Sequence, residues 1–137
     1  MKKAIFFIFT LLLLMYLCSA YAQVATTQTT NDTIVFSDSV LESKISSALG
    51  KPEGDITLED AASLDWLDAN APQDTPDHER IKDVSDLRYF VNLTGVCLDN
   101  NSVEDVSAMA ALPHLEQLWL LGNPMSNLES IKPLQGL

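Results

Sequence analysis

The stretch LTGVCLDNNSV, residues 93–103, decides the fold, because the chain repeats its pattern as LEQLWLLGNPM at residues 115–125. The two stretches align without a gap, with apolar residues at the same places and with Asn101 aligned to Asn123. Three further apolar positions match in each copy, and every matched pair is separated by the same 22-residue interval, as from Leu93 to Leu115. A fixed period of this length indicates one structural unit used twice.

The shared spacing L-x-x-L-x-L-x-x-N-x-L is typical of a leucine-rich solenoid, which belongs to the α/β class. One coil of this length buries too little apolar surface to pay for ordering its own backbone, so the coils have to stack. We therefore expect the matched leucines to face a continuous core shared by neighbouring coils.

An irregular coil precedes the two regular ones. Leu64, Leu67 and Ala69 show the same pattern as Leu93, Val96 and Leu98, but the distance between the two sets is longer than one period. The later apolar positions of this coil, from Ile81 on, keep the 22-residue spacing to the next coil. The difference is an insertion within residues 71–80 (APQDTPDHER), whose prolines and charges predict a solvated loop. We assign residues 64–137 to the repeats, ending at the start of a further one. We expect the edge of the last repeat to be open to edge-to-edge self-association.

Residues 36–63 predict a helical N-terminal cap. Ser39 and Glu42 fit a capping box at the start of a helix that ends at Gly50, before Pro52. A second box, Thr57 to Asp60, begins a shorter helix. Two small helices in front of a repeat array would cover the apolar end of its first coil.

Residues 1–22 read as a secretory signal peptide, with Lys2 and Lys3 before an apolar run and Ala20-Tyr21-Ala22 as a site for cleavage before Gln23. A retained anchor is the alternative, but the apolar run is short for a bilayer, which needs about 20 residues. Residues 23–35 are Thr-rich and predict a disordered linker. The expected location is secreted or extracytoplasmic, in the periplasm or at the cell surface.

The formal net charge of −11 disfavours nucleic acid and anionic lipid as partners. The signal segment would remove two of the eight basic residues and none of the acidic ones. It would also remove one of the two cysteines, leaving Cys97, so an internal disulfide is not expected.

The segment FSDSVLESKISSALGKPEGDITLEDAASLDWLDA (residues 36–69) resembles the N-terminal cap of bacterial internalin-like leucine-rich repeat proteins, and the two regular blocks resemble their 22-residue repeats. The resemblance covers about residues 36–137. It implies a right-handed solenoid with a short parallel sheet on its concave face and 3₁₀-like turns on its convex face. It also implies a secreted or surface protein that binds other proteins, and a structural asparagine ladder at Asn101 and Asn123.

Alternation along the expected strands places every second side chain on the concave face. Stacking the coils in register aligns three rows there: Trp66 with Gly95 and Gln117; Asp68 with Cys97 and Trp119; Asn70 with Asp99 and Leu121. Tryptophan dominates many binding hot spots, so these rows form the candidate binding site. The alternative is that Trp66 is covered by the cap and Trp119 by a further repeat or loop.

Catalytic and metal-dependent chemistry finds little support in the residues. Asp77, His78 and Glu79 are adjacent rather than convergent, and His114 is far along the repeats, so we expect neither a metal site nor a cofactor. Cys97 has no evident base partner. The sequence therefore predicts a non-enzymatic module that binds a protein ligand. The alternative is an N-terminal piece of a longer multidomain surface protein whose activity lies beyond residue 137.

Overall fold

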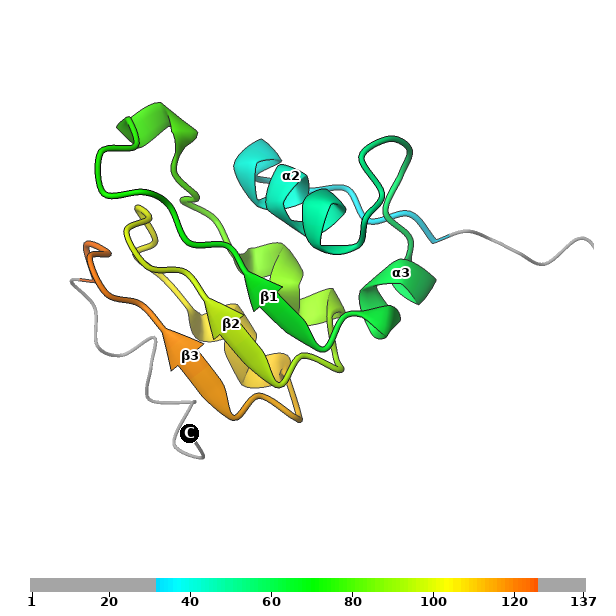
Figure 1. Cartoon of the computed structure of the whole chain (residues 1–137). Coiled ribbons are helices and arrows are strands. Elements are labelled where there is room, and N and C mark those ends of the chain that lie inside the picture. Colours follow the sequence, from blue (N-terminus) through cyan, green and yellow to red (C-terminus); the bar gives the residue numbers. More distant parts are fainter. Residues whose placement is uncertain (1–31, 126–137) are drawn as a thin grey trace, which may run out of the picture. The chain divides into compact units, whose positions relative to one another are not determined.

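The computed structural model describes residues 32–125. Its first two helices are α2 (Ser39–Ala48) and α3 (Leu58–Ser63) (Figure 1). The strands are β1 (Trp66–Asp68), β2 (Gly95–Cys97) and β3 (Gln117–Trp119). The 3₁₀ helices are η1 (Asp77–Glu79), η2 (Ser85–Tyr89) and η3 (Ser107–Ala111). The expected signal peptide, most of the expected linker and the second half of the last regular repeat lie outside the described residues.

The strands form a parallel sheet in the order β1-β2-β3, with Leu67 beside Val96 and Val96 beside Leu118. Each connection between strands crosses to the opposite side, where η2 and η3 lie side by side behind the sheet (Figure 1). The predicted leucine-rich repeat solenoid is confirmed, with its sheet on the concave face, 3₁₀ turns on the convex face and a helical N-terminal cap.

The core lies between the sheet and the 3₁₀ layer. All seven apolar repeat positions from Leu93 to Leu112 are buried, and the most exposed of them, Leu112, is only 6% exposed. The matching positions of the next coil that fall in the described residues are partly buried against the same core: Leu115, Leu118, Leu120 and Met125. The irregular coil contributes equally, through Leu64, Leu67, Ala69, Ile81, Val84, Leu87 and Phe90.

Asn101 connects the backbones of two coils from a fully buried position. Its Nδ2 donates to the carbonyl oxygens of Ala69 at 2.9 Å and Leu98 at 3.0 Å, and its Oδ1 accepts from the N–H of Ile81 at 3.0 Å. An amide side chain is suited to this place because it carries both donors and an acceptor. Asn101 therefore satisfies turn groups that would otherwise be buried without partners.

Asn123 makes the same set of bonds one coil later. It donates to the carbonyls of Leu98 at 2.8 Å and Leu120 at 3.1 Å, and accepts from the N–H of Val103 at 3.0 Å. The N–H donors Ile81 and Val103 are themselves separated by one repeat period. The asparagine contacts thus follow the period of the repeat.

A second repeated device begins the 3₁₀ helices. The carboxylate of Asp83 accepts from the N–H of Ser85, and that of Asp105 accepts from the N–H of Ser107, each at 2.8 Å. The bond from Ser107 is the main reason that the pKa of Asp105 lies below its ordinary value. These two aspartates are also separated by one repeat period.

Asp38, and not the predicted Ser39, caps helix α2. One carboxylate oxygen of Asp38 accepts from the N–H groups of Val40 and Leu41. The other oxygen accepts from the N–H groups of Lys82 and Asp83 in the first coil, at 2.8 and 3.1 Å. A serine hydroxyl could not serve both elements at once, which explains why the aspartate occupies the cap. The predicted role of Ser39 was therefore wrong.

Further contacts attach the cap to the first coil. Asp86, buried in η2, accepts from the N–H of Ser37 at 2.7 Å, and Lys44 of α2 donates to the carbonyl of Asn70 at 2.8 Å. Pairing begins before residue 36, because Thr33 forms an antiparallel bridge with Thr57 and Ile34 is buried. The cap is thus held by polar contacts as well as by its apolar face.

Helix α3 begins with the predicted capping box, in which Thr57 and Asp60 bond each other's backbone N–H groups. Lys51 donates to the same carboxylate of Asp60 at 2.7 Å. The hydrogen bond from Lys51, followed by that from the Thr57 backbone, lowers the pKa of Asp60 to about 2. The box is therefore confirmed and is strengthened by a cation.

The insertion at residues 71–80 is largely exposed to solvent, as predicted, but it is also tied to its surroundings. Arg80 donates to the carbonyls of Thr75 at 2.8 Å and Gln73 at 3.0 Å. Asp77 in η1 accepts from Lys82 and from the Ser102 hydroxyl of the next coil. These bonds give the loop a defined shape.

Within the described residues, no helix has both the length and the apolar character needed to cross a bilayer.

We expect Asn101→Ala to lower the free energy of unfolding by about 1–3 kcal/mol, because it leaves buried backbone donors and acceptors without partners. Chemical denaturation followed by circular dichroism measures this loss. Asn123→Ala is the matched comparison and should cost less, since Asn123 is only partly buried and water can replace its bonds. Equal stability of the Asn101→Ala variant and the wild type would contradict the role of Asn101.

Acid should destabilise the cap. The pKa of Asp38 is lowered: its burial opposes ionisation, but N–H donors from Lys82, Asp83, Leu41 and Val40 outweigh that effect. Since this folded-state pKa and that of Asp60 lie below the ordinary 3.8, the two carboxylates stabilise the fold above about pH 4 and lose this effect as the pH falls toward about 2.

Melting temperatures measured between about pH 6 and pH 2 test this expectation. Asp60→Asn should melt lower than the wild type at neutral pH and show a smaller further loss in acid. An Asp60→Asn variant with the full acid sensitivity of the wild type would refute the contribution of Asp60.

Candidate functional site

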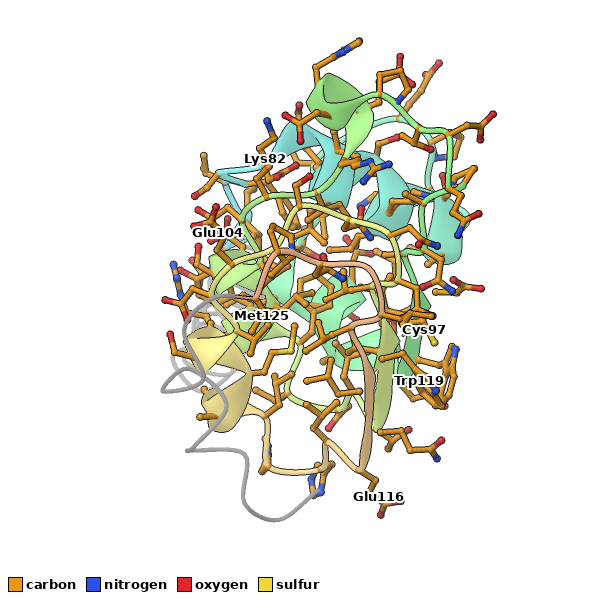
Figure 2. The ribbon with its side chains drawn as sticks, turned by 90° about the vertical axis from the view of Figure 1, so that its left-hand side faces the viewer. Lys82, Cys97, Glu104, Glu116, Trp119 and Met125 are labelled. Carbon is orange, nitrogen blue, oxygen red and sulfur yellow. The ribbon has the colours of Figure 1, made fainter. Side chains whose placement is uncertain are left out.

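The solvent-facing side of the sheet carries the residues that the sequence places in rows. Trp66 pairs in register with Gly95, and Gly95 with Gln117; Asp68 pairs with Cys97, and Cys97 with Trp119. The intervening residues Leu67, Val96 and Leu118 point to the core. Figure 2 shows Cys97 and Trp119 on one side of the molecule, with Lys82 and Glu104 on the other.

Trp66 and Trp119 come from β1 and β3, yet their rings meet across the middle strand. The ring centroids are 5.6 Å apart and the planes are tilted by 57°, which is a favourable geometry for an aromatic pair. The side chains remain 41% and 40% exposed. The two tryptophans therefore form one surface feature, which we call the tryptophan pair.

Gly95 makes this pairing possible. A Cβ atom at residue 95 would lie 2.5 Å from Cε3 of Trp66 and closer still to Cζ3, so the indole of Trp66 lies directly over the glycine backbone. Any larger residue would push the ring away from Trp119. Sequence reasoning placed Gly95 in the row without a role, and the signal available was a glycine within a strand, which often marks a close approach of another group.

Cys97 lies beside the pair and is partly buried. Burial raises the pKa of its thiol, and the negative charges of Asp68 and Asp99 raise it further. The thiol is therefore neutral at physiological pH, which disfavours it as a nucleophile. Cys97 contributes surface rather than reactivity to this face.

Two residues of the third row, Asn70 and Asp99, also hold neighbouring coils together. The side-chain oxygen of Asn70 accepts from the N–H of Asp99 at 2.7 Å, and the carboxylate of Asp99 accepts from the N–H of Leu121 at 2.8 Å. Asn70 and Asp99 thus link successive coils in the same way as the asparagine ladder does. Leu121 is the most exposed member of this row, at 75%.

Other candidate groups do not converge. His78 lies 3.5 Å from Glu79, and both are well exposed. Among residues 32–125, no three histidine, cysteine, aspartate or glutamate side chains are grouped so that they could hold a metal ion.

A shallow groove beside the cap is another hollow feature, and its lining is formed by Asp32, Thr33, Ile34, Val35, Leu58 and Tyr89. Its lining contains one carboxylate, that of Asp32, and no histidine, cysteine or basic side chain. The concave face is therefore the candidate site.

Comparison with known proteins supports this architecture. An internalin C2 structure from Listeria monocytogenes matches with 26% identity and a TM-score of 0.65, over 75% of this chain and 43% of that one. Internalin InlF from the same species matches the fold with 23% identity and a TM-score of 0.53, over 82% of this chain and 38% of that one. No protein-family model and no curated protein matches the chain.

A structure of the CBM51-2 and INT domains of ZmpB from Clostridium perfringens matches with 31% identity and a TM-score of 0.54, over 64% of this chain and 17% of that one. The chain thus spans less than half the length of each of these proteins. Its fold is that of a leucine-rich repeat protein. More narrowly, its fold is internalin-like, with a helical cap followed by 22-residue coils.

Gly95→Ala should separate the tryptophan pair while leaving the fold in place, because the new methyl group meets the end of a flexible side chain rather than backbone. The expected result is loss of the coupled-indole signal in circular dichroism and a changed fluorescence spectrum, with cooperative unfolding retained. Cys97→Ser, which faces the same side of the same strand, should keep the signal. An unchanged indole signal in Gly95→Ala would show that the pair does not depend on Gly95.

Proposed function

We propose that this protein is a non-enzymatic binding module that takes a protein ligand on its concave face. The observation that carries the proposal is the tryptophan pair: two large aromatic side chains held in contact on a regular sheet, each still about 40% exposed. Rigid aromatic groups of this kind are the usual anchors of protein interfaces, because they bury much area at little conformational cost. Similarity to internalins supports the same assignment.

The surrounding residues fit an interface anchor. Asp68 and Gln117 are exposed at either side of the pair, and Leu121 adds an apolar side chain in the next row. An apolar centre with a polar rim is the common anatomy of such surfaces. The proposed contact residues are Trp66, Asp68, Asn70, Cys97, Asp99, Gln117, Trp119 and Leu121.

We further propose that residues 1–22 direct export and are removed before Gln23, which would place the module outside the cytoplasm. Sequencing the amino terminus of the exported protein tests this. A mature chain beginning at Gln23 is expected, and a chain that keeps Met1 would refute it.

A second candidate function is that of an accessory module within a longer surface polypeptide. The match to ZmpB favours it, since there a similar domain occupies a small share of a chain that also contains CBM51-2. The intact mass of the protein from its natural source separates the two proposals. A mass corresponding to residues 23–137 supports the small binder, and a larger mass supports the accessory module.

Trp119→Ala should weaken binding strongly without unfolding the protein. Ligands would be selected with the full-length protein from a displayed library of extracellular protein domains. The dissociation constant should rise by about 30-fold or more, as expected for loss of a hot-spot tryptophan. Calorimetry of binding and a thermal melt of each variant give the two readouts.

Tyr89→Ala is the matched control, because Tyr89 is an aromatic residue of similar exposure, 37%, on η2 rather than on the sheet. It should bind as the wild type does. Undiminished binding by Trp119→Ala, or an equal loss in both variants, would overturn the concave-face assignment.

A further inference from the structure

The tryptophan pair offers a surface suited to a cation. The face of an indole ring attracts ammonium and guanidinium groups, more strongly than the other aromatic side chains do. Trp66 and Trp119 present two such rings, tilted toward one another by 57°. A planar guanidinium could stack on one ring while its edge meets the other.

Two carboxylates accompany the pair on the same face. One oxygen of Asp68 accepts from the N–H of Asn70 at 3.2 Å, and one oxygen of Asp99 accepts from the N–H of Leu121 at 2.8 Å. Within residues 32–125, the second oxygen of each carboxylate accepts no hydrogen bond, so it is available to a ligand. This face is thus negatively charged, and one oxygen of each carboxylate can still accept a hydrogen bond from a ligand.

No cation of the described chain neutralises these carboxylates. None of the five lysine and arginine residues between 32 and 125 pairs with Asp68 or Asp99, although Lys44 donates to the carbonyl of Asn70 in the third row. The others bond the cap, the insertion loop or η2: Lys51, Arg80, Lys82 and Arg88. The pKa of the Cys97 thiol is raised mainly by burial and secondly by the negative charges of Asp68 and Asp99. The negative field of these two carboxylates therefore reaches the middle strand, β2.

We propose that the concave face binds its protein partner through an exposed arginine, whose guanidinium lies against the tryptophan pair and bonds the free oxygens of Asp68 and Asp99. This inference rests on the proposed function and names the chemistry of the partner. Arginine fits better than lysine because its planar fork both stacks on aromatic rings and bonds carboxylates in pairs. A partner with a basic patch would also be drawn to this acidic protein from a distance.

The chain provides its own probes for the test. It contains two tryptophans, so its indole N–H groups give two nuclear magnetic resonance signals, and both belong to the tryptophan pair. The full-length protein would be titrated with a blocked Gly-Arg-Gly-Arg-Gly peptide. The control peptide carries citrulline, which has the shape of arginine without its charge. Saturable shifts of both signals with the arginine peptide, and none with the citrulline peptide, are expected.

Charge-removing variants then test the role of the two carboxylates without disturbing the fold. Asp68→Asn and Asp99→Asn each keep a side-chain oxygen for the Asn70 or Leu121 N–H, so the coils should stay in place. Each should weaken the arginine peptide about two- to five-fold, as for loss of one exposed ion pair. Asp105→Asn removes the same charge from the 3₁₀ side, where the carboxylate also accepts a backbone N–H, and should have no effect.

The outcomes distinguish the two levels of proposal. Equal shifts with arginine and citrulline peptides, or full affinity in both Asp68→Asn and Asp99→Asn, would overturn the assignment of a basic partner. If the arginine peptide has no effect but a domain selected from the library still shifts both indole signals, the concave face binds proteins and only the partner chemistry is wrong. If neither ligand shifts the signals, the proposed function also falls. A lysine peptide that binds more tightly than the arginine peptide would refute the preference for arginine.

Discussion

Hydrogen bonds between amide or carboxylate side chains and the backbone of a neighbouring coil are the interaction on which this structure depends. Each strand has only three residues, and backbone bonds between coils extend a little further, to the Ala71 N–H on the Asp99 carbonyl and the Asn100 N–H on the Leu121 carbonyl. Asn101 and Asn123 satisfy the turns that leave the strands, while Asn70 and Asp99 continue the ladder beyond the strand ends. Asp38 likewise accepts backbone hydrogen bonds from the first coil, where the cap meets it. Apolar burial drives the stacking, and these bonds determine its register.

That register also produces the candidate site. Trp66 and Trp119 are far apart in the chain, and only the side-by-side alignment of β1, β2 and β3 brings their rings together. Gly95 supplies the space between them. The site is therefore a property of three coils acting jointly, and the scaffold below it is fully packed, with Leu67, Val96 and Leu98 completely buried.

The sequence predicted those features that repeat along the chain. The 22-residue period identified the solenoid, its buried positions and the facing rows, because a repeat constrains many residues at once. It did not identify Asp38 as the helix cap, because adjacent Asp and Ser are both good capping residues and the choice depends on the distant Lys82 and Asp83 backbone. The pairing of Trp66 with Trp119 was equally hidden, since it depends on ring orientations across a strand. The hydrogen bonds of Asn70 and Asp99 could not be predicted, because they depend on the distance between neighbouring coils, which a single sequence does not give.

The position of the two indoles on the outer strands β1 and β3 has a thermodynamic consequence. A ligand that touches both rings can bind only when the intervening coil is stacked between them, so its binding free energy adds to the cohesion of the array. Recognition and folding are then linked: occupancy would hold together coils that are individually unstable, and a loosened array would lose its ligand before it lost its secondary structure.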